Sequence, residues 1–132
     1  MDITKLLVDP AKEQAGVWTD YDETSSLLIG SITSRRYKDA YQSELDSARI
    51  KLRKISNEQA EKIQIKVLAK AVLLNWKGVK KGEAEYPYSQ ENAEYILTNC
   101  PQVREFVLQA AANIENFKAE TVEEAKAQTG EA

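Results

Sequence analysis

Few side chains in this 132-residue sequence are suited to covalent chemistry. There is no histidine, which is the side chain used most often for acid–base catalysis near neutral pH and the commonest metal ligand. The single cysteine, Cys100, therefore has no histidine to act as its base, and it cannot form a disulfide within the chain. The alternative for Cys100 is structural, a small half-buried residue at a corner between two helices. These features predict no catalytic residue, no cofactor and no metal site.

Acidic side chains are the remaining candidates for catalysis, because the chain has 21 Asp and Glu residues. That number leaves a catalytic pair of carboxylates open as an alternative. The sequence has, however, no glycine-rich phosphate-binding loop and no strand–turn–helix nucleophile motif. We therefore expect the protein to act by non-covalent binding and not as an enzyme.

The charged residues are distributed unevenly along the chain. Positions 35–81 contain 13 Lys and Arg against 5 Asp and Glu, a net charge of +8, whereas the remaining residues carry a net charge of −11. Segregated charge can steer association with a partner, or head-to-tail association with a second copy. The alternative is that solvated helix faces neutralise one another within one fold.

A nucleic-acid-binding module is the alternative from another functional class. Basic runs at positions 49–54 and 77–81 have aromatic residues nearby, as such modules do. Against this, the isoelectric point of the chain is about 5.1, and Glu44 and Asp46 are interleaved with the basic residues. We therefore expect no nucleic-acid partner.

No stretch of the sequence approaches the ~18 apolar residues needed to cross a bilayer. Residues 1–16 lack the basic start and the long apolar segment that mark a signal peptide. The expectation is a cytoplasmic protein in a reducing compartment, with no membrane contact.

The first elements expected along the chain are a hairpin and a long helix. In the lead-in at 1–15, Pro10 is expected to end any short strand. Residues 16–33 have the β-branched and aromatic content of a β-hairpin around a polar turn, and Gly30 suggests a bulge or a close backbone approach. Positions 35–55 predict a helix. Its apolar stripe consists of Tyr37, Tyr41, Leu45, Ala48, Leu52 and Ile55.

Three further helices are expected in the second half. A capping box at 56–59 begins a helix that runs to about Trp76, and a loop follows. Ser89 caps the next helix, and Pro101 begins the last one. The core stripe of that last helix consists of Val103, Phe106, Val107, Ala110, Ala111, Ile114 and Phe117.

These elements together predict a mainly α protein. It would be a small helical domain of about four helices, with an N-terminal β-hairpin at about 16–33. A single domain is expected to cover residues 1–117. Residues 118–132 contain almost no large apolar side chain, so they are expected to form a frayed or disordered acidic tail.

The sequence between positions 72 and 117 carries a family resemblance. Its motif has the form W-x-G-V, P-Y-S-x-E-N-A and then spaced apolar residues. The matching residues are Trp76, Gly78, Val79, Pro87, Tyr88, Ser89, Glu91, Asn92, Ala93, Leu97, Pro101, Val107, Ala111 and Phe117. With the hairpin and the tyrosine-bearing basic helix before it, the chain over about 15–117 resembles the tail assembly chaperones of long-tailed, non-contractile phages and prophages. The segment 80–85 departs from that family, because it is more charged than the family's Asp- and Gly-rich turn.

The resemblance implies a function. Proteins of this type bind the tape measure protein in the host cytoplasm, keep it soluble, help to recruit tail tube subunits and leave before the virion is mature. In many of these phages a frameshifted, longer form binds the tail tube protein. Several copies of the chaperone would self-associate along the tape measure protein. A structural tail or connector component that stays in the virion is the alternative.

Binding of this kind would use an apolar or aromatic groove that accepts amphipathic helices. The candidate partner-binding residues are Tyr37, Tyr41, Trp76, Tyr86 and Tyr88. For each of them, the alternative is a packing role in or beside the core.

Overall fold

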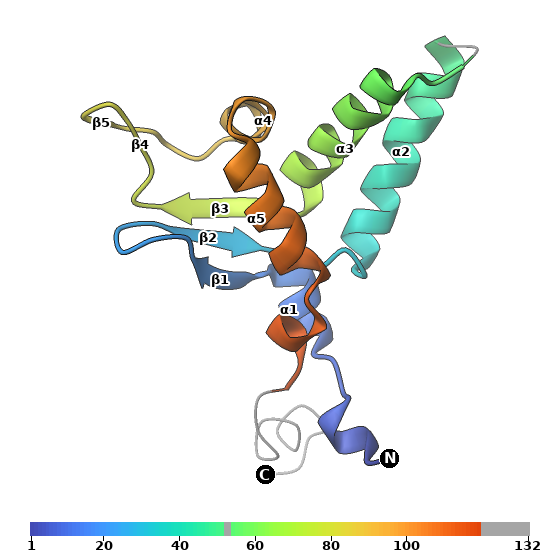
Figure 1. Cartoon of the computed structure of the whole chain (residues 1–132). Coiled ribbons are helices and arrows are strands. Elements are labelled where there is room, and N and C mark those ends of the chain that lie inside the picture. The colour runs from blue at the N-terminus through green and yellow to red at the C-terminus, as the bar shows by residue number, and fades with distance from the viewer. Residues whose placement is uncertain (52–53, 120–132) are drawn as a thin grey trace.

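The computed structural model describes residues 1–51 and 54–119 (Figure 1). In chain order its elements are the 3-10 helix η1 (Ile3–Lys5), α1 (Pro10–Ala15), β1 (Val17–Asp20), β2 (Ser26–Ile29), α2 (Arg35–Lys51), α3 (Asn57–Ala71), β3 (Leu73–Lys77), β4 (Lys80–Lys81), β5 (Ala84–Glu85), α4 (Gln90–Asn99), α5 (Pro101–Ala112) and the 3-10 helix η2 (Ile114–Phe117). Helices and strands thus alternate along the chain, and the fold combines both.

The two helix starts predicted from capping residues are confirmed. The Ser56 hydroxyl accepts a hydrogen bond from the Gln59 backbone N–H, and the Gln59 side chain accepts one from the Ser56 backbone N–H. The Ser89 hydroxyl accepts a hydrogen bond from the backbone N–H of Asn92 at the start of α4. Both caps satisfy backbone donors that have no partner within their helix.

The main sheet is antiparallel with the order β1-β2-β3, so β2 is its central strand. Leu27 of β2 pairs with Trp76 of β3, and both side chains are buried, whereas β1 has half-buried side chains that alternate with exposed ones. The backbone N–H of Gly30 donates to the Val72 carbonyl over 2.8 Å, which brings the end of β2 against the end of α3. This confirms the close backbone approach predicted at Gly30.

The core lies between one face of this sheet and the helices α3, α4 and α5. Its buried members come from the sheet (Leu27, Ile29, Leu73 and Trp76), from α3 and its end (Ile65, Leu68, Ala69, Ala71 and Val72), from α4 (Ala93 and Leu97) and from α5 (Val107, Ala110 and Ala111). Apolar side chains from distant parts of the sequence are removed from water together, which is the main stabilising contribution to such a domain.

The helices α2 and α3 form a hairpin that projects away from the sheet (Figure 1). Lys70 of α3 and Glu44 of α2 form an ion pair across it. None of the residues of α2 is buried, although Tyr37 packs against the edge of the core. Leu52, which was expected in the apolar stripe of this helix, lies outside the described residues.

The predicted fold class is wrong. The expected helix that ran to about Trp76 ends at Ala71, and Leu73–Lys77 form a strand in the middle of the chain instead. This strand completes a three-stranded sheet with the expected hairpin, and a second sheet, β4-β5, occupies the expected loop. The domain is therefore a combination of five α-helices and two antiparallel sheets in the described residues, not a mainly helical bundle of about four helices with an appended hairpin.

Two local expectations need adjustment. The expected short strand before Pro10 is a single antiparallel bridge between Val8 and Lys118, and Pro10 then begins α1, because the Asp9 side chain caps that helix and proline suits its first turn. Ile114, expected in the core, is 53% exposed, because α5 ends at Ala112 and the chain continues as a 3-10 helix. Of the expected tail, residues 120–132 lie outside the described part of the chain.

Candidate functional site

Four aromatic side chains gather at the end of β3 and the start of α4. The rings of Trp76 and Tyr86 stack with centroids 6.0 Å apart, and Tyr88 meets Trp76 edge to face at 5.0 Å. Tyr95 of α4 lies 6.3 Å from Tyr86. These four residues are the aromatic cluster. Trp76 is the buried member of the cluster, with 7% of its surface exposed, whereas Tyr95 is 48% exposed at the protein surface.

Polar contacts hold the aromatic cluster in place. The indole Nε1 of Trp76 donates to the Tyr86 carbonyl over 2.7 Å, and the Tyr88 hydroxyl donates to the Leu73 carbonyl over 2.8 Å. The Asn92 side chain donates to the Pro87 carbonyl, which fixes the entry to α4. Buried Trp and Tyr side chains usually require a hydrogen-bond partner of this kind.

Gly78 brings the segment after β3 against the β1–β2 turn. Its φ of +73° is a left-handed conformation that favours glycine. A Cβ atom at this position would lie 1.9 Å from the Thr24 carbonyl oxygen, so the two backbones meet too closely for any other residue. The β1–β2 turn and segment 78–80 therefore form one rim.

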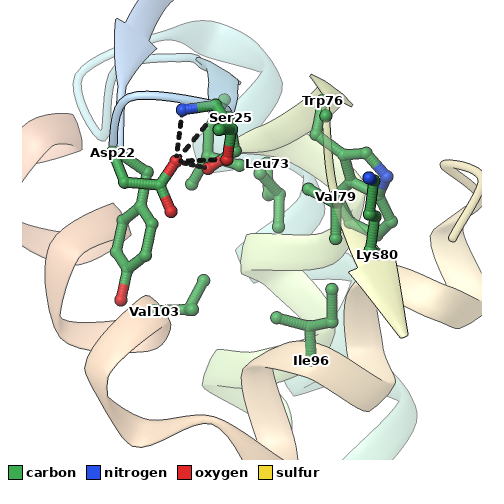
Figure 2. A pocket seen from close by; sticks show the side chains of 12 residues that line it. Asp22, Ser25, Leu73, Trp76, Val79, Lys80, Ile96 and Val103 are labelled. Atoms are coloured by element: carbon green, nitrogen blue, oxygen red, sulfur yellow. Dashed lines mark hydrogen bonds between the residues drawn. The ribbon is translucent and has the colours of Figure 1, made fainter. Parts of the chain in front are cut away.

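Below this rim lies a pocket of about 300 Å³ (Figure 2). Its lining residues are Tyr21, Asp22, Thr24, Ser25, Leu27, Leu73, Trp76, Gly78, Val79, Lys80, Ile96 and Val103. Aliphatic side chains reach the pocket from four places: Leu73 from β3, Val79 from segment 78–80, Ile96 from α4 and Val103 from α5. This apolar pocket suits an aliphatic side chain, because it removes apolar surface from water on all of these sides.

The two sides of the pocket mouth carry opposite charges. On one side, one carboxylate oxygen of Asp22 accepts hydrogen bonds from the backbone N–H groups and hydroxyls of Thr24 and Ser25. The hydrogen bond from Ser25 is the largest of the effects that lower the pKa of Asp22 below its ordinary value, so the carboxylate is negative at neutral pH. Lys80 lies on the other side of the mouth (Figure 2).

A second pocket, of about 240 Å³, lies beside the first and shares Trp76, Gly78, Val79 and Lys80 with it. Tyr86 and Tyr88 line it on the side of the aromatic cluster. Lys81 lies over the ring of Tyr95, with 4.7 Å from its Nζ to the ring centroid, where it contributes a cation–π contact. Lys80 and Lys81 form no ion pair with any residue in 1–51 or 54–119.

The five predicted partner-binding residues fall into two groups. Trp76, Tyr86 and Tyr88 belong to the aromatic cluster. Tyr37 and Tyr41 stack on each other on α2 with centroids 6.1 Å apart, and no ring contact joins them to the cluster in the described part of the chain. Whether any of these side chains binds a partner stays a prediction.

Electrostatics show that the two groups are not remote from each other. Burial raises the pKa of Tyr88, and the positive charge of Arg36, the neighbour of Tyr37, partly offsets this rise. Burial also raises the pKa of Tyr37, and the adjacent Tyr41 adds to this effect. The start of α2 thus lies within electrostatic range of the aromatic cluster.

Sequence reasoning missed Tyr95, Lys81 and the apolar pocket. Tyr95 could have been found, because it lies off the apolar face of α4 that Ala93 and Leu97 bury. An aromatic side chain on the polar face of an amphipathic helix is a signal for contact with something else. The pocket could not be found in this way, because its lining residues come from the β1–β2 turn, the strands β2 and β3, segment 78–80 and the helices α4 and α5.

No group of three or more Cys, Asp and Glu side chains is placed to hold a metal ion in the described residues. Within 1–51 and 54–119, every helix is also too short or too polar to span a bilayer. Cys100 is half-buried at the corner between α4 and α5, which is the position expected for it in its structural alternative.

Comparison with known proteins gives the family of the chain. No curated protein and no solved structure matches it. The model of the family described as YdaY prophage protein matches residues 32–128. That range includes α2, α3, the whole aromatic cluster and α5, and it covers well over half of the 132 residues. The chain therefore belongs to the YdaY prophage protein family.

Proposed function

We propose that this prophage protein is a tail assembly chaperone. It binds the tape measure protein, keeps it soluble and helps to recruit tail tube subunits, acting in the host cytoplasm and leaving before the tail is complete. A frameshifted, longer form of the chain would contact the tail tube protein. Membership of a prophage family supports the proposal, as does the resemblance of segment 72–117 to such chaperones.

The aromatic cluster is the observation that carries the proposal. The half-buried Tyr86 stacks on the buried Trp76, and the exposed Tyr95 lies against Tyr86 at the surface. Rigid aromatic side chains supply large contact areas at low entropic cost, which is why they dominate binding energies at protein interfaces. An amphipathic helix of the tape measure protein would place its apolar face on these rings.

The lysines around the cluster define the partner further. Lys81 stands over Tyr95 and Lys80 lies at the shared wall of the two pockets, and neither has an acidic partner among the described residues. A helix with carboxylates beside its apolar face would satisfy these charges while its apolar face meets the rings. Several chaperone copies along one long partner would then bind with avidity.

The test is co-expression of this protein with the tape measure protein of the same prophage, followed by pull-down and measurement of soluble tape measure protein. Tyr86→Ala and Tyr95→Ala should each reduce the captured amount by about tenfold, as for loss of an interface hot spot. Ile114→Ala is the matched control, because Ile114 is exposed and lies in η2, away from the cluster. A tape measure protein that stays insoluble with the parent chain would contradict the proposal.

The same test separates the two groups of predicted residues. Tyr41→Ala removes a 41% exposed ring from α2 without touching the aromatic cluster. Loss of capture with this variant alone would move the binding face to α2. Retention of the protein in purified virions would instead favour a structural tail or connector component.

A further inference from the structure

The last turn of α2, at the tip of the α2–α3 hairpin, carries an apolar side chain that is almost fully exposed. Ile50 is 86% exposed, whereas Leu45 and Ala48 of the same helix are half-buried against α3. Its neighbours along the chain are Arg49 and Lys51, both exposed. A single exposed isoleucine is ordinary on a protein surface. It indicates a contact only if the molecule also has a surface that can bind it.

The apolar pocket is such a complement in shape and in charge. It measures about 300 Å³, which is ample room for one isoleucine side chain, and its lining includes the aliphatic residues Leu27, Leu73, Val79, Ile96 and Val103. The turn that forms one side of its mouth carries Asp22 and Glu23, and Asp20 ends β1 directly before it; all three are exposed. An isoleucine between two cations therefore matches an apolar pocket beside three carboxylates.

The two surfaces cannot meet within one molecule. The α2–α3 tip projects to one side of the sheet, whereas the β1–β2 turn lies at the opposite end of the fold (Figure 1). A contact between them has to join two copies. Because the surfaces differ, such a contact is head-to-tail, and it generates a row or a ring of copies instead of a two-fold dimer.

We propose that copies of this chain associate head-to-tail, with Ile50 of one copy inserted into the apolar pocket of the next. Arg49 and Lys51 then face Asp22 and Glu23 of the turn. The inserted helix has to lie with these cations toward the turn and away from Lys80, which fixes its orientation. Tyr86 and Tyr88 of the aromatic cluster line the second pocket and not the apolar pocket, so each copy in the row keeps these tyrosines available.

The inference deepens the proposed function, since it supplies the row of copies that a long partner would need. Its test uses the full chain alone, without tape measure protein, so failure of the chaperone proposal leaves the result unaffected. Sedimentation velocity at increasing protein concentration in low salt measures self-association. Ile50→Ser and Val103→Phe should each weaken it by about tenfold or more, the effect of losing one buried isoleucine. Ile50→Leu, which keeps an aliphatic side chain, should restore it.

Mixing the two defective variants gives the decisive result. Ile50→Ser keeps an intact pocket and Val103→Phe keeps an intact tip, so together they should form a complex of two copies that cannot grow further. If Val103→Phe does not fold, Val79→Phe fills the same pocket from segment 78–80. A parent chain that stays monomeric at about 100 μM, variants that associate like the parent, or a mixture without a dimer would each overturn the proposal.

Discussion

Gly78 holds the rim of the apolar pocket together through its backbone. Replacing it by alanine forces a left-handed conformation on a residue with a side chain and places the methyl group on the Thr24 carbonyl oxygen. We expect Gly78→Ala to lower the free energy of unfolding by about 3 kcal/mol, measured by urea denaturation. Gly82→Ala is the matched control, because its φ is +67° but no atom lies within 4 Å of the new methyl group. That variant should cost only about 1 kcal/mol, and equal losses would show that the contact with Thr24 is unimportant.

The hydroxyl of Tyr88 contributes a separate, testable stabilisation. It donates to the Leu73 carbonyl, so Tyr88→Phe removes one partly buried hydrogen bond and leaves the ring in place. The expected loss in unfolding free energy is about 1 kcal/mol. Tyr86→Phe is the control, since the Tyr86 hydroxyl makes no hydrogen bond with the described residues. A similar loss in both variants would contradict this assignment.

The partly buried phenols of Tyr37 and Tyr88 should make the stability of the fold depend on pH. Burial raises the pKa of Tyr88 and of Tyr37 above the ordinary value of 10.0. In the unfolded chain these phenols ionise near pH 10, while the folded protein keeps them protonated to a higher pH. Stability from this source is therefore complete below pH 10 and is lost as the pH rises through the raised pKa values. Denaturation followed from pH 9 to 11 should show this fall, and Tyr88→Phe should reduce it.

Among the elements, α4 connects the cap at Ser89 to the position of the aromatic cluster. Ser89→Ala removes the hydrogen bond to the Asn92 backbone and should cost about 1 kcal/mol of stability. Because Tyr88 precedes the cap and Tyr95 follows it on α4, the variant should also weaken capture of the tape measure protein. Ser56→Ala removes the equivalent cap of α3, away from the cluster, and should lower stability by a similar amount without affecting capture. An equal effect of both variants on capture would mean that only overall stability matters.

The helices that have local capping signals were predictable, whereas the strand β3 was not. Ser56 and Ser89 mark their helices within a few residues of sequence. The apolar run from Val67 to Leu74, by contrast, fits both a buried helix and a buried strand, because its periodicity does not distinguish them. What decides the matter is the pairing of Leu27 with Trp76, which are far apart in sequence.

The candidate site was predictable only in part, for the same reason. Trp76, Tyr86 and Tyr88 are close in sequence, so a shared location was a natural expectation. The apolar pocket depends on α5 and the β1–β2 turn meeting across the sheet, and Val103 contributes to it from a position nearly eighty residues after that turn. Contacts between segments so far apart leave no pattern in the local sequence.

At the scale of the whole molecule, the uneven charge distribution predicts a dependence of association on salt. The basic segment 35–81 includes the α2–α3 hairpin, and the acidic turn lies at the other end of the fold. Exposed charges are screened over about 4 Å at 0.5 M salt, so self-association should weaken between low salt and ~0.5 M. Sedimentation at several salt concentrations measures this, and Arg49→Gln with Lys51→Gln should flatten the dependence. Association that is indifferent to salt would contradict it.

The absence of any buried residue in α2 has a consequence for how the molecule fluctuates. Backbone amides exchange with solvent deuterium through local openings, whose free energy depends on the contacts that an opening breaks. The strands β2 and β3 enclose the best-packed part of the core, so their amides should exchange only when the whole domain unfolds. Opening α2 disrupts mainly half-buried contacts with α3, so its amides should exchange orders of magnitude faster. Occupation of the hairpin tip by another copy would then appear as slowed exchange within this single helix.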